Sequence, residues 1–198
     1  MSTSVEALIK LTLLSAFVSS VCCVNQAVLE YYWRPWTPGS PPSDAITLRD
    51  YRGVSYIVEA YVPNHGLHVG QVFANQQEVN VTVANTSVVT NTVFLVRSST
   101  DLKVLCSQSL DKVSWYPTSN ANVQNELVTA VINPVLGGVN NFNQAVYIGR
   151  VAATTTQRPW LIGSVVKDNR LRYHFGGITT SAAVYEILVV NSNKCLGG

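Results

Sequence analysis

Hydrophobic and polar positions alternate over short stretches of this chain, and this pattern predicts β-strands. Residues 79–83 alternate with a period of two, as the residues of a half-buried strand do. Residues 55–62 are rich in β-branched and aromatic side chains, which favour strands. The apolar runs 93–96 and 185–190 are continuous, so we expect these strands to be more fully buried. Because no segment outside the N-terminal leader keeps a helical period, the pattern predicts an all-β fold.

The same motifs follow one another twice along the chain, which indicates an internal repeat. Trp33 and Trp115 each begin an aromatic, Pro-containing segment, and their shared repeat position predicts that both are core residues. The other matched segments are 44–46 with 126–128, 56–60 with 147–151, 69–72 with 162–165, and 94–96 with 187–189. The offset between the copies grows along the chain. We place the extra residues near 133–138, a turn-rich stretch where insertions are tolerated.

The repeat divides the chain into two modules of similar size. We assign residues 30–98 to the first module, 113–190 to the second, 99–112 to a polar connector and 191–198 to a C-terminal tail. A module of roughly 70–80 residues is marginal for an isolated hydrophobic core. We therefore expect two pseudo-symmetric antiparallel β modules that share a core. In one version of this arrangement the modules exchange strands, so that the first segment of each copy completes the other's sheet.

The N-terminal residues 1–23 predict a cleaved signal peptide, because an apolar run after Lys10 ends in small residues. The run is short and interrupted for a membrane span of about 20 residues. A signal anchor and a buried first helix are the alternatives. Secretion would permit a disulfide between Cys106 and Cys195, with two free thiols as the alternative. It would also make Asn80 and Asn85 candidate glycosylation sites, since each begins a sequon.

The composition and motifs favour a binding protein over an enzyme. Only 12% of the residues are charged, the net charge is +2, and no Lys/Arg cluster is present, so we expect no nucleic-acid partner. The chain has no Gly-x-Ser-x-Gly element, P-loop, His-Glu-x-x-His motif or close carboxylate pair. His65, His68 and His174 lack zinc-ligand spacing, so we expect no metal or cofactor. His65 and His68 are predicted to be solvated in a loop.

The repeated block resembles the DM9 repeat over about residues 31–190. The motifs that carry the resemblance are 42–46, 50–53 and 69–72 in the first copy and 147–151, 162–165, 175–177 and 185–189 in the second. This family includes mannose-binding lectins of invertebrate immunity and mosquito proteins that respond to parasites. The resemblance implies an all-β fold of paired repeats that binds glycans.

The resemblance also implies where a sugar would bind. In the lectins of the family, a turn Asp accepts hydrogen bonds from sugar hydroxyls and a strand Lys donates them. Asp50 and Gln71 occupy these positions in the first copy, and Asn140 or Asn141 and Ser164 occupy them in the second. The lysine is therefore replaced in both copies, which removes its charge assistance. The alternative is that Asp50 stabilises its own turn and Gln71 is an exposed strand residue.

Two tryptophans and one arginine are further candidates. Trp36 and Trp160 have no repeat partner and are candidates for stacking on a sugar face. Arg150 lies on an apolar strand, where we expect an ion pair with Glu186. Glu59 carries the opposite charge at the repeat position of Arg150, so we hypothesise complementary pairing of Glu59 and Arg150 between the copies.

Together with the predicted signal peptide, the resemblance implies a secreted carbohydrate-binding protein, lectin-like and of the mannose type, that acts in invertebrate innate immunity or saliva. Its expected partners are glycans or a glycoprotein surface, and it could form a homodimer. The alternative function is a structural or interaction protein that keeps the DM9 fold and has lost the sugar site. A third function, a membrane-active subunit, follows from related repeats that occur beside pore-forming domains.

Overall fold

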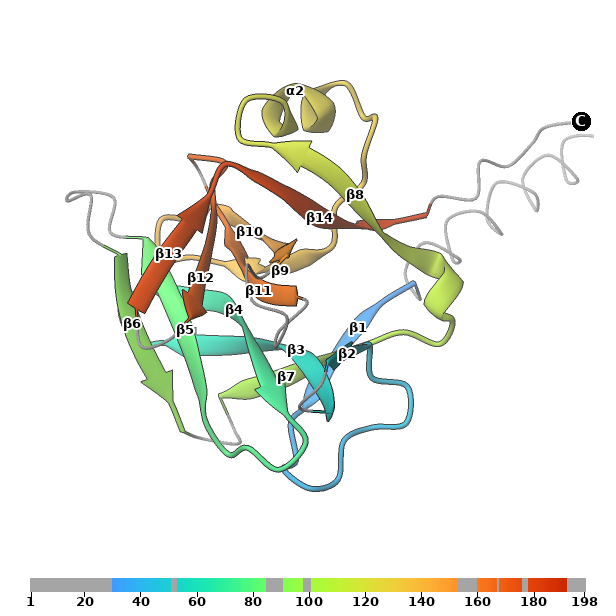
Figure 1. The fold of residues 1–198 in the computed structure, drawn as a ribbon, viewed down its shortest axis with the longest axis vertical. Helices are drawn as coiled ribbons and strands as arrows, with labels where there is room; N and C mark the ends of the chain where they lie inside the picture. The colour runs from blue at the N-terminus through green and yellow to red at the C-terminus, as the bar shows by residue number, and fades with distance from the viewer. Residues whose placement is uncertain are drawn as a thin grey trace, which may run out of the picture.

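The computed structural model describes residues 30–50, 53–84, 91–97, 101–152, 160–166, 168–175 and 178–191. These residues form antiparallel strands with two short helical elements, which confirms the predicted all-β class (Figure 1). The strands are β1 (Tyr32–Pro35), β2 (Thr47–Asp50), β3 (Gly53–Val62), β4 (Gly66–Phe73), β5 (Val79–Ala84), β6 (Asn91–Val96), β7 (Leu102–Cys106), β8 (Val113–Ser119), β9 (Leu136–Val139), β10 (Ala145–Ala152), β11 (Trp160–Val165), β12 (Leu171–Phe175), β13 (Ile178–Ala182) and β14 (Val184–Val190); the helical elements are η2 (Leu110–Lys112) and α2 (Val123–Val128). No helix among the described residues has the length and apolar character needed to cross a membrane.

The first sheet is built around the long strand β3. Strands β2 and β7 pair with successive parts of one edge of β3, and β4 pairs with the other edge. Strand β1 pairs with the outer edge of β7, which places Trp33 opposite Leu105. In the same register Val58 lies opposite Val104. Both edges of β3 are therefore paired with strands that lie within residues 32–106.

The second sheet has the same order around β10. Strands β9 and β14 share one edge of β10, and β11 pairs with the other. Strand β8 pairs with β14, which places Trp115 opposite Leu188. Strands β12 and β13 continue this sheet beyond β11, whereas β5 and β6 form a separate two-stranded sheet. Because β1 and β8 each pair within their own sheet, the copies do not exchange their first strands.

Strand β7 corrects two expectations. Val58 and Gly149 are matched positions of the two copies. Val104 of β7 lies opposite Val58, and Ile187 of β14 lies opposite Gly149. Strand β7 is therefore the counterpart of β14. The expected match of 94–96 with 187–189 is therefore wrong. Strand β7 also lies inside residues 99–112, the expected polar connector, although its side chains at 102, 104, 105 and 106 are fully buried. A five-residue strand that contains a lysine has too little apolar periodicity to be recognised from sequence.

The extra residues of the second copy form α2. The amide of Ile46 donates to the carbonyl of Leu105, and the amide of Val135 donates to the carbonyl of Leu188. Val135 is therefore the counterpart of Ile46, and the match of 44–46 with 126–128 is wrong. Residues 126–128 lie in α2 instead. An acidic residue followed by two apolar ones is too short a pattern to distinguish a helix from a strand.

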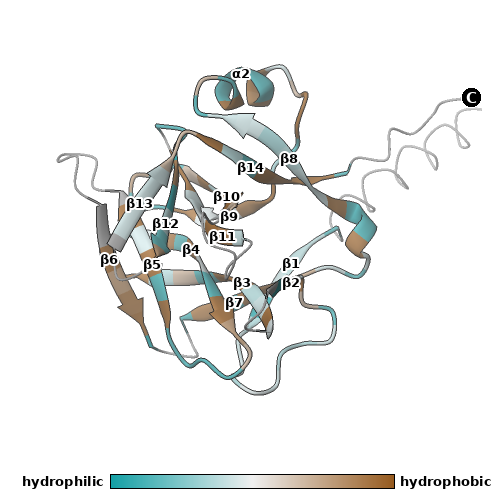
Figure 2. Cartoon of the chain, viewed as in Figure 1, coloured by the Kyte–Doolittle hydropathy of each residue, from teal (hydrophilic) through white to brown (hydrophobic). Residues whose placement is uncertain are grey.

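Three hydrophobic clusters hold the layers together. The central cluster contains residues from both halves of the chain, and Trp33 and Trp115 pack partly buried against it. Its buried members are Ile46, Leu48, Ile57, Val69, Leu105, Val135, Val146, Ile148, Ile162, Val166, Leu188 and Val190. A second cluster joins the first sheet to the β5–β6 hairpin, and a third joins the second sheet to α2. Apolar residues run along β6 and β14 in Figure 2.

Glycines let the two copies approach closely. A Cβ on Gly137 would lie 2.3 Å from Cγ2 of Val69, and a Cβ on Gly66 would lie 2.7 Å from Cα of Asn140. Strand β9 therefore packs directly on β4. Residues 133–138, which we expected to be a stretch that tolerates insertions, instead form part of the contact between the copies. A glycine that allows two backbones to approach closely looks the same in sequence as a glycine of a turn.

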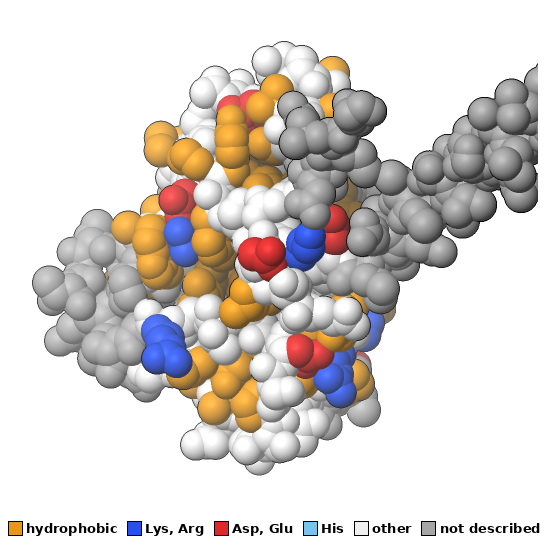
Figure 3. All heavy atoms as spheres, turned by 90° about the vertical axis from the view of Figure 1, so that its right-hand side faces the viewer, with side chains coloured by type: hydrophobic (Ala, Val, Ile, Leu, Met, Phe, Trp, Pro, Cys, Tyr) orange, Lys and Arg blue, Asp and Glu red, His pale blue; other side chains and the backbone are white. Residues whose placement is uncertain are grey.

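Several charged side chains of the described residues form ion pairs. These ion pairs are Arg34–Asp44, Arg97–Glu78, Lys103–Glu59, Arg150–Glu186 and Arg172–Asp168. On the face shown in Figure 3, basic and acidic side chains lie side by side in several places. The positive charges on this face are therefore largely compensated by neighbouring carboxylates.

Candidate functional site

The expected site of the first copy lies at β2 and β4. The backbone of Asp50 ends β2 opposite Gly53, and its side chain lies outside the described residues. The side-chain amide of Gln71 donates to Oγ of Ser55 at 2.8 Å, and that hydroxyl donates in turn to the carbonyl of Leu48 at 3.4 Å. Gln71 is therefore a half-buried residue whose amide already has a partner within its own sheet.

The expected site residues of the second copy lie at the contact between the copies. Oδ1 of Asn140 accepts hydrogen bonds from the backbone amides of Phe142 and Gln144, each at 3.0 Å, and so shapes the β9–β10 turn. The side-chain amide of Asn141 donates to the carbonyl of Asn64 in the first copy at 2.6 Å. These contacts hold the turn of one copy against the β3–β4 turn of the other.

Ser164 lies deeper in the same contact. It is only 1% exposed, and its Oγ accepts a hydrogen bond from the amide of Val69 at 2.9 Å. At the two equivalent positions where the resemblance implies a ligand-binding lysine, Ser164 is buried and Gln71 is half-buried. Ser164 is closed to a ligand in this structure.

The two candidate tryptophans have structural partners. Trp36 is 1% exposed, its Nε1 donates to the carbonyl of Gln76 at 2.9 Å, and its ring lies against Tyr56. The expectation that Trp36 is a surface residue is therefore wrong, because its side chain belongs to the buried cluster that joins the first sheet to β5 and β6. The loop that follows it is held to the residue after β4 by a hydrogen bond from the amide of Gly39 to the carbonyl of Ala74. Trp160 is half-buried, and the guanidinium of Arg150 lies 3.7 Å from its ring centroid.

Arg150 is the centre of a structural cluster. Its guanidinium also lies 4.4 Å from the ring centroid of Trp115 and forms the expected ion pair with Glu186. Glu59 pairs with Lys103 at 3.2 Å, so each copy satisfies its own charge. The hypothesis of complementary pairing of Glu59 and Arg150 between the copies is therefore wrong. Lys103 corresponds to Glu186 by strand register, so both charges of the pair are reversed between the copies.

Removal of this cationic side chain is the first stability test. Arg150→Ala is expected to lower the unfolding free energy by about 2 kcal/mol, since a hydrogen bond to a charged group contributes about 1.5–3 kcal/mol and two indole faces also lose a cation. Urea denaturation measures the change. Arg97→Ala is the control, because Arg97 and Glu78 form an exposed pair with side chains 75% and 49% accessible. Equal losses in the two variants would refute the structural role of the cluster.

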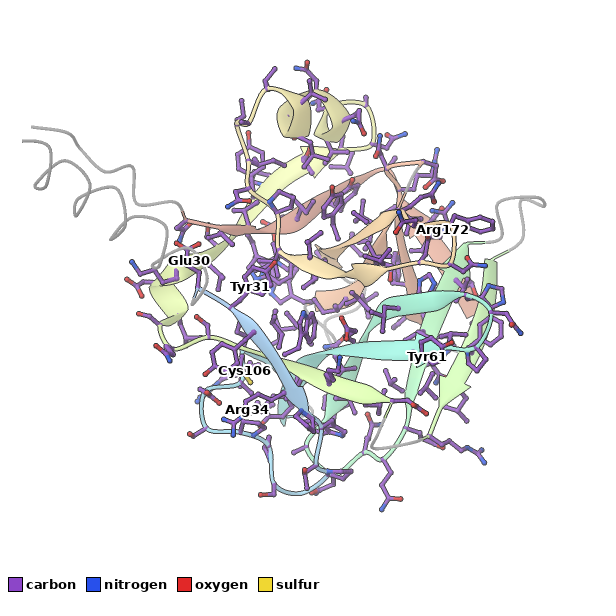
Figure 4. All side chains as sticks on the ribbon, turned by 180° about the vertical axis from the view of Figure 1, so that it is seen from behind. Glu30, Tyr31, Arg34, Tyr61, Cys106 and Arg172 are labelled. Atoms are coloured by element: carbon purple, nitrogen blue, oxygen red, sulfur yellow. The ribbon has the colours of Figure 1, made fainter. Side chains whose placement is uncertain are left out.

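The cysteines do not form the expected disulfide in this structure. Cys106 is a free thiol at the end of β7, fully buried, and Cys195 lies outside the described residues. Burial, and next the negative charge of Asp44, raise the pKa of the Cys106 thiol to about 12. Figure 4 shows Cys106 near Arg34 beside β1 and β7. A buried thiol with a raised pKa is unreactive, so this position is part of the core.

The glycosylation candidates and the histidines differ in their exposure. Asn80 is exposed on β5, and Asn85 lies outside the described residues, as does the expected signal peptide. His68 is 2% exposed, so the expectation that it is solvated is wrong. It faces Ala60 across the β3–β4 pair on the side of the buried second cluster. Among the described residues no group of three or more His, Cys, Asp or Glu side chains could hold a metal ion.

A pocket of about 320 Å³ lies beside α2, and its lining residue Gln144 is hydrogen-bonded to Asn140, one of the expected site residues of the second copy. It is formed by α2, by the beginning of β10 with the residue before it, and by the turn that follows β11. The lining residues are Gln124, Leu127, Val128, Gln144, Ala145, Tyr147, Val166 and Asn169. They are distant in sequence and come together only because α2 packs on the second sheet through the buried Val123. No spacing in the sequence could have indicated this pocket.

The pocket is neutral and offers amide groups. Gln124, Gln144 and Asn169 bring three primary amides, and no lining residue is charged. Two acidic residues adjacent in sequence have other partners, since Glu126 accepts a hydrogen bond from Thr118 at 2.5 Å and Asp168 pairs with Arg172. A primary amide both donates and accepts hydrogen bonds, so this lining suits an uncharged ligand with several polar groups.

The fold defines an all-β protein of packed antiparallel sheets with a pocket of small-molecule size. No protein-family model matches the chain, and no curated protein matches it either.

Proposed function

We propose that this protein is a secreted carbohydrate-binding protein that takes an uncharged sugar in the pocket beside α2. The observation that carries the proposal is the lining of that pocket, which contains three amide residues together with apolar residues and Tyr147. Sugar hydroxyls need partners that both donate and accept, and the apolar face of a sugar ring packs on aromatic and aliphatic side chains. The pocket offers both kinds of partner.

The three amide residues of the pocket differ in the hydrogen bonds that they already make within the protein. Gln124 is exposed on α2, and none of the described hydrogen bonds involves its side chain. Oε1 of Gln144 accepts a hydrogen bond from Nδ2 of Asn140 at 3.0 Å, which orients this side chain at the base of the turn. Asn169 has a left-handed backbone with φ of 58°, and its carbonyl accepts a hydrogen bond from the Tyr185 hydroxyl at 2.7 Å. Two of the three residues are therefore positioned before a ligand binds.

Resemblance to DM9 lectins supports sugar binding and suggests mannose, with Asp50 as a ligand residue. The pocket offers a different position in the second copy. The competing function is an interaction protein that has lost the sugar site. It is supported by Asn141 and Ser164, whose polar groups contact the first copy at the positions where the resemblance implies a ligand.

Replacement of a pocket amide tests the proposal. Gln124→Ala is expected to lower the affinity for the preferred sugar by a factor of at least about ten, because hydrogen bonds to the ligand are lost. Glycan-array binding of the full chain identifies the sugar, and calorimetry measures the affinity. Asn125→Ala is the matched control, because Asn125 is the neighbouring exposed α2 residue outside the pocket lining. It is expected to bind as the unmodified protein does.

The same array separates the competing positions. An Asp50→Ala variant that loses binding while Gln124→Ala keeps it would move the site to the first copy. Failure of the unmodified protein to bind any glycan would exclude the proposal and favour the interaction protein. Appearance of the chain in culture medium, with its N-terminus determined by mass spectrometry, tests secretion separately.

A further inference from the structure

We infer that the pocket beside α2 selects a sugar that carries an acetamido group, such as a 2-acetamido-2-deoxyhexose. This inference rests on the proposed function. It is based on the balance of apolar and polar lining, on the size of the pocket and on the chemistry of the amides.

The lining combines apolar and aromatic side chains with amides. Leu127, Val128, Ala145, Tyr147 and Val166 form five of its eight residues. A hexose carries a hydroxyl on nearly every carbon, and a hydroxyl buried against an aliphatic wall loses its hydrogen bonds to water without replacement. An acetamido methyl has no such cost, and burial of a methyl group against this wall is favourable.

The polar part of the lining matches an amide. An acetamido group has one N–H donor and one carbonyl acceptor, and each primary amide of Gln124, Gln144 and Asn169 offers both complementary functions. A charged substituent has no counterpart, because no lining residue is charged. The pocket therefore favours the neutral N-acetyl form of an amino sugar over the free amine, whose ammonium would be desolvated without an anionic partner.

The size of the pocket limits the ligand to one sugar unit. A volume of about 320 Å³ is near the lower end of the range of about 300–1,000 Å³ for small-molecule sites. Val128 is 75% exposed, so the pocket is open on the α2 side. A single terminal acetamido sugar can enter there while the rest of a chain remains in solvent.

Two matched ligand pairs test this inference. The full chain is titrated with N-acetylglucosamine and glucose, and with N-acetylgalactosamine and galactose, while saturation-transfer NMR records which ligand protons contact the protein. Glucosamine is included as the free amine. We expect at least one acetamido sugar to bind about tenfold more tightly than its parent hexose and than glucosamine. A tenfold difference is the discrimination that one buried methyl-sized group provides. The acetamido methyl should receive the strongest saturation.

A pair of exposed valines provides the variants. Val128→Ser is expected to weaken binding of the acetamido sugar several-fold and to weaken binding of the parent hexose less, because the hexose has no methyl group to pack on this wall. Val184→Ser is the control, since Val184 is 74% exposed and lies outside the lining. Equal affinity for the acetamido sugar and the hexose, with binding lost in Gln124→Ala, would overturn the inference and leave the proposed function standing. Binding of none of these sugars, and of no glycan on the array, would overturn both.

Discussion

A Gly66→Ala variant is expected to lose about 3 kcal/mol of unfolding free energy, the largest effect of a single methyl group that we predict. Gly66 has φ of +88°, a conformation that costs an L residue about 1–2 kcal/mol. Its Cβ would also lie 2.7 Å from Cα of Asn140 and 2.8 Å from the amide nitrogen of Asn141. These are backbone atoms, so relief requires the turns of the two copies to separate. Separation would break the hydrogen bond from the Asn141 amide to the carbonyl of His65.

Gly39 provides a control that isolates the contact between the copies. It has φ of +78°, and the nearest atom to an added Cβ, Oδ1 of Asn75, lies at 3.8 Å. Gly39→Ala should therefore show only the conformational cost of about 1 kcal/mol. Urea denaturation of both variants gives the comparison. The same loss in both would mean that the packing of Gly66 on Asn140 contributes nothing to stability.

Acidification from pH 6.5 to pH 4 is expected to lower the unfolding free energy by about 3 kcal/mol through His68 alone. Burial lowers the pKa of His68 to about 4 from its usual 6.5. Nε2 of this ring lies 3.3 Å from the carbonyl of His65, and Nδ1 is buried without a partner among the described residues. A proton on Nδ1 would therefore place a charged donor in the core with no acceptor.

The direction of this effect follows from proton binding. Between pH 6.5 and pH 4 the unfolded chain binds a proton at His68 and the folded chain does not, so stability falls as the pH falls. Below pH 4 both states are protonated at His68 and its effect is complete. Glu59 acts in the opposite direction, because burial raises its pKa and the folded state then binds the additional proton.

A His68→Gln variant separates these contributions. The difference in unfolding free energy between this variant and the unmodified protein, measured at pH 7.5 and pH 4.5, removes the effect of Glu59 and of other groups common to both. The fall on acidification should be smaller in the variant. An NMR titration of the imidazole protons measures the pKa directly, and a midpoint near pH 6.5 in the folded protein would refute the prediction.

Several strands could be predicted because they carry their own periodic signal. Residues 55–62 and 185–190 lie in β3 and β14, and the alternating residues 79–83 lie in β5. The matched positions of Trp33 and Trp115, opposite Leu105 and Leu188, likewise follow from the repeat. A period of two and a repeated aromatic are local features, so they do not depend on which sheet a strand joins.

The candidate pocket could not be predicted in this way. Its amides come from α2, the start of β10 and the turn after β11, and no local pattern relates them. The burial of Trp36 was equally hidden, because a tryptophan beside a proline looks the same whether a loop leaves the surface or folds back over the core. Both depend on contacts between residues distant in the chain.

The sequence by itself determined the all-β class and the strand periodicity, since these depend on neighbouring residues. Only the tertiary structure decided that β7 completes the first sheet, that Glu59 pairs with Lys103, and that Ser164 is closed within the contact between the copies. The reason is physical: a side chain's exposure and partner are set by the surface that packs against it. In this chain that surface is often supplied by the other copy.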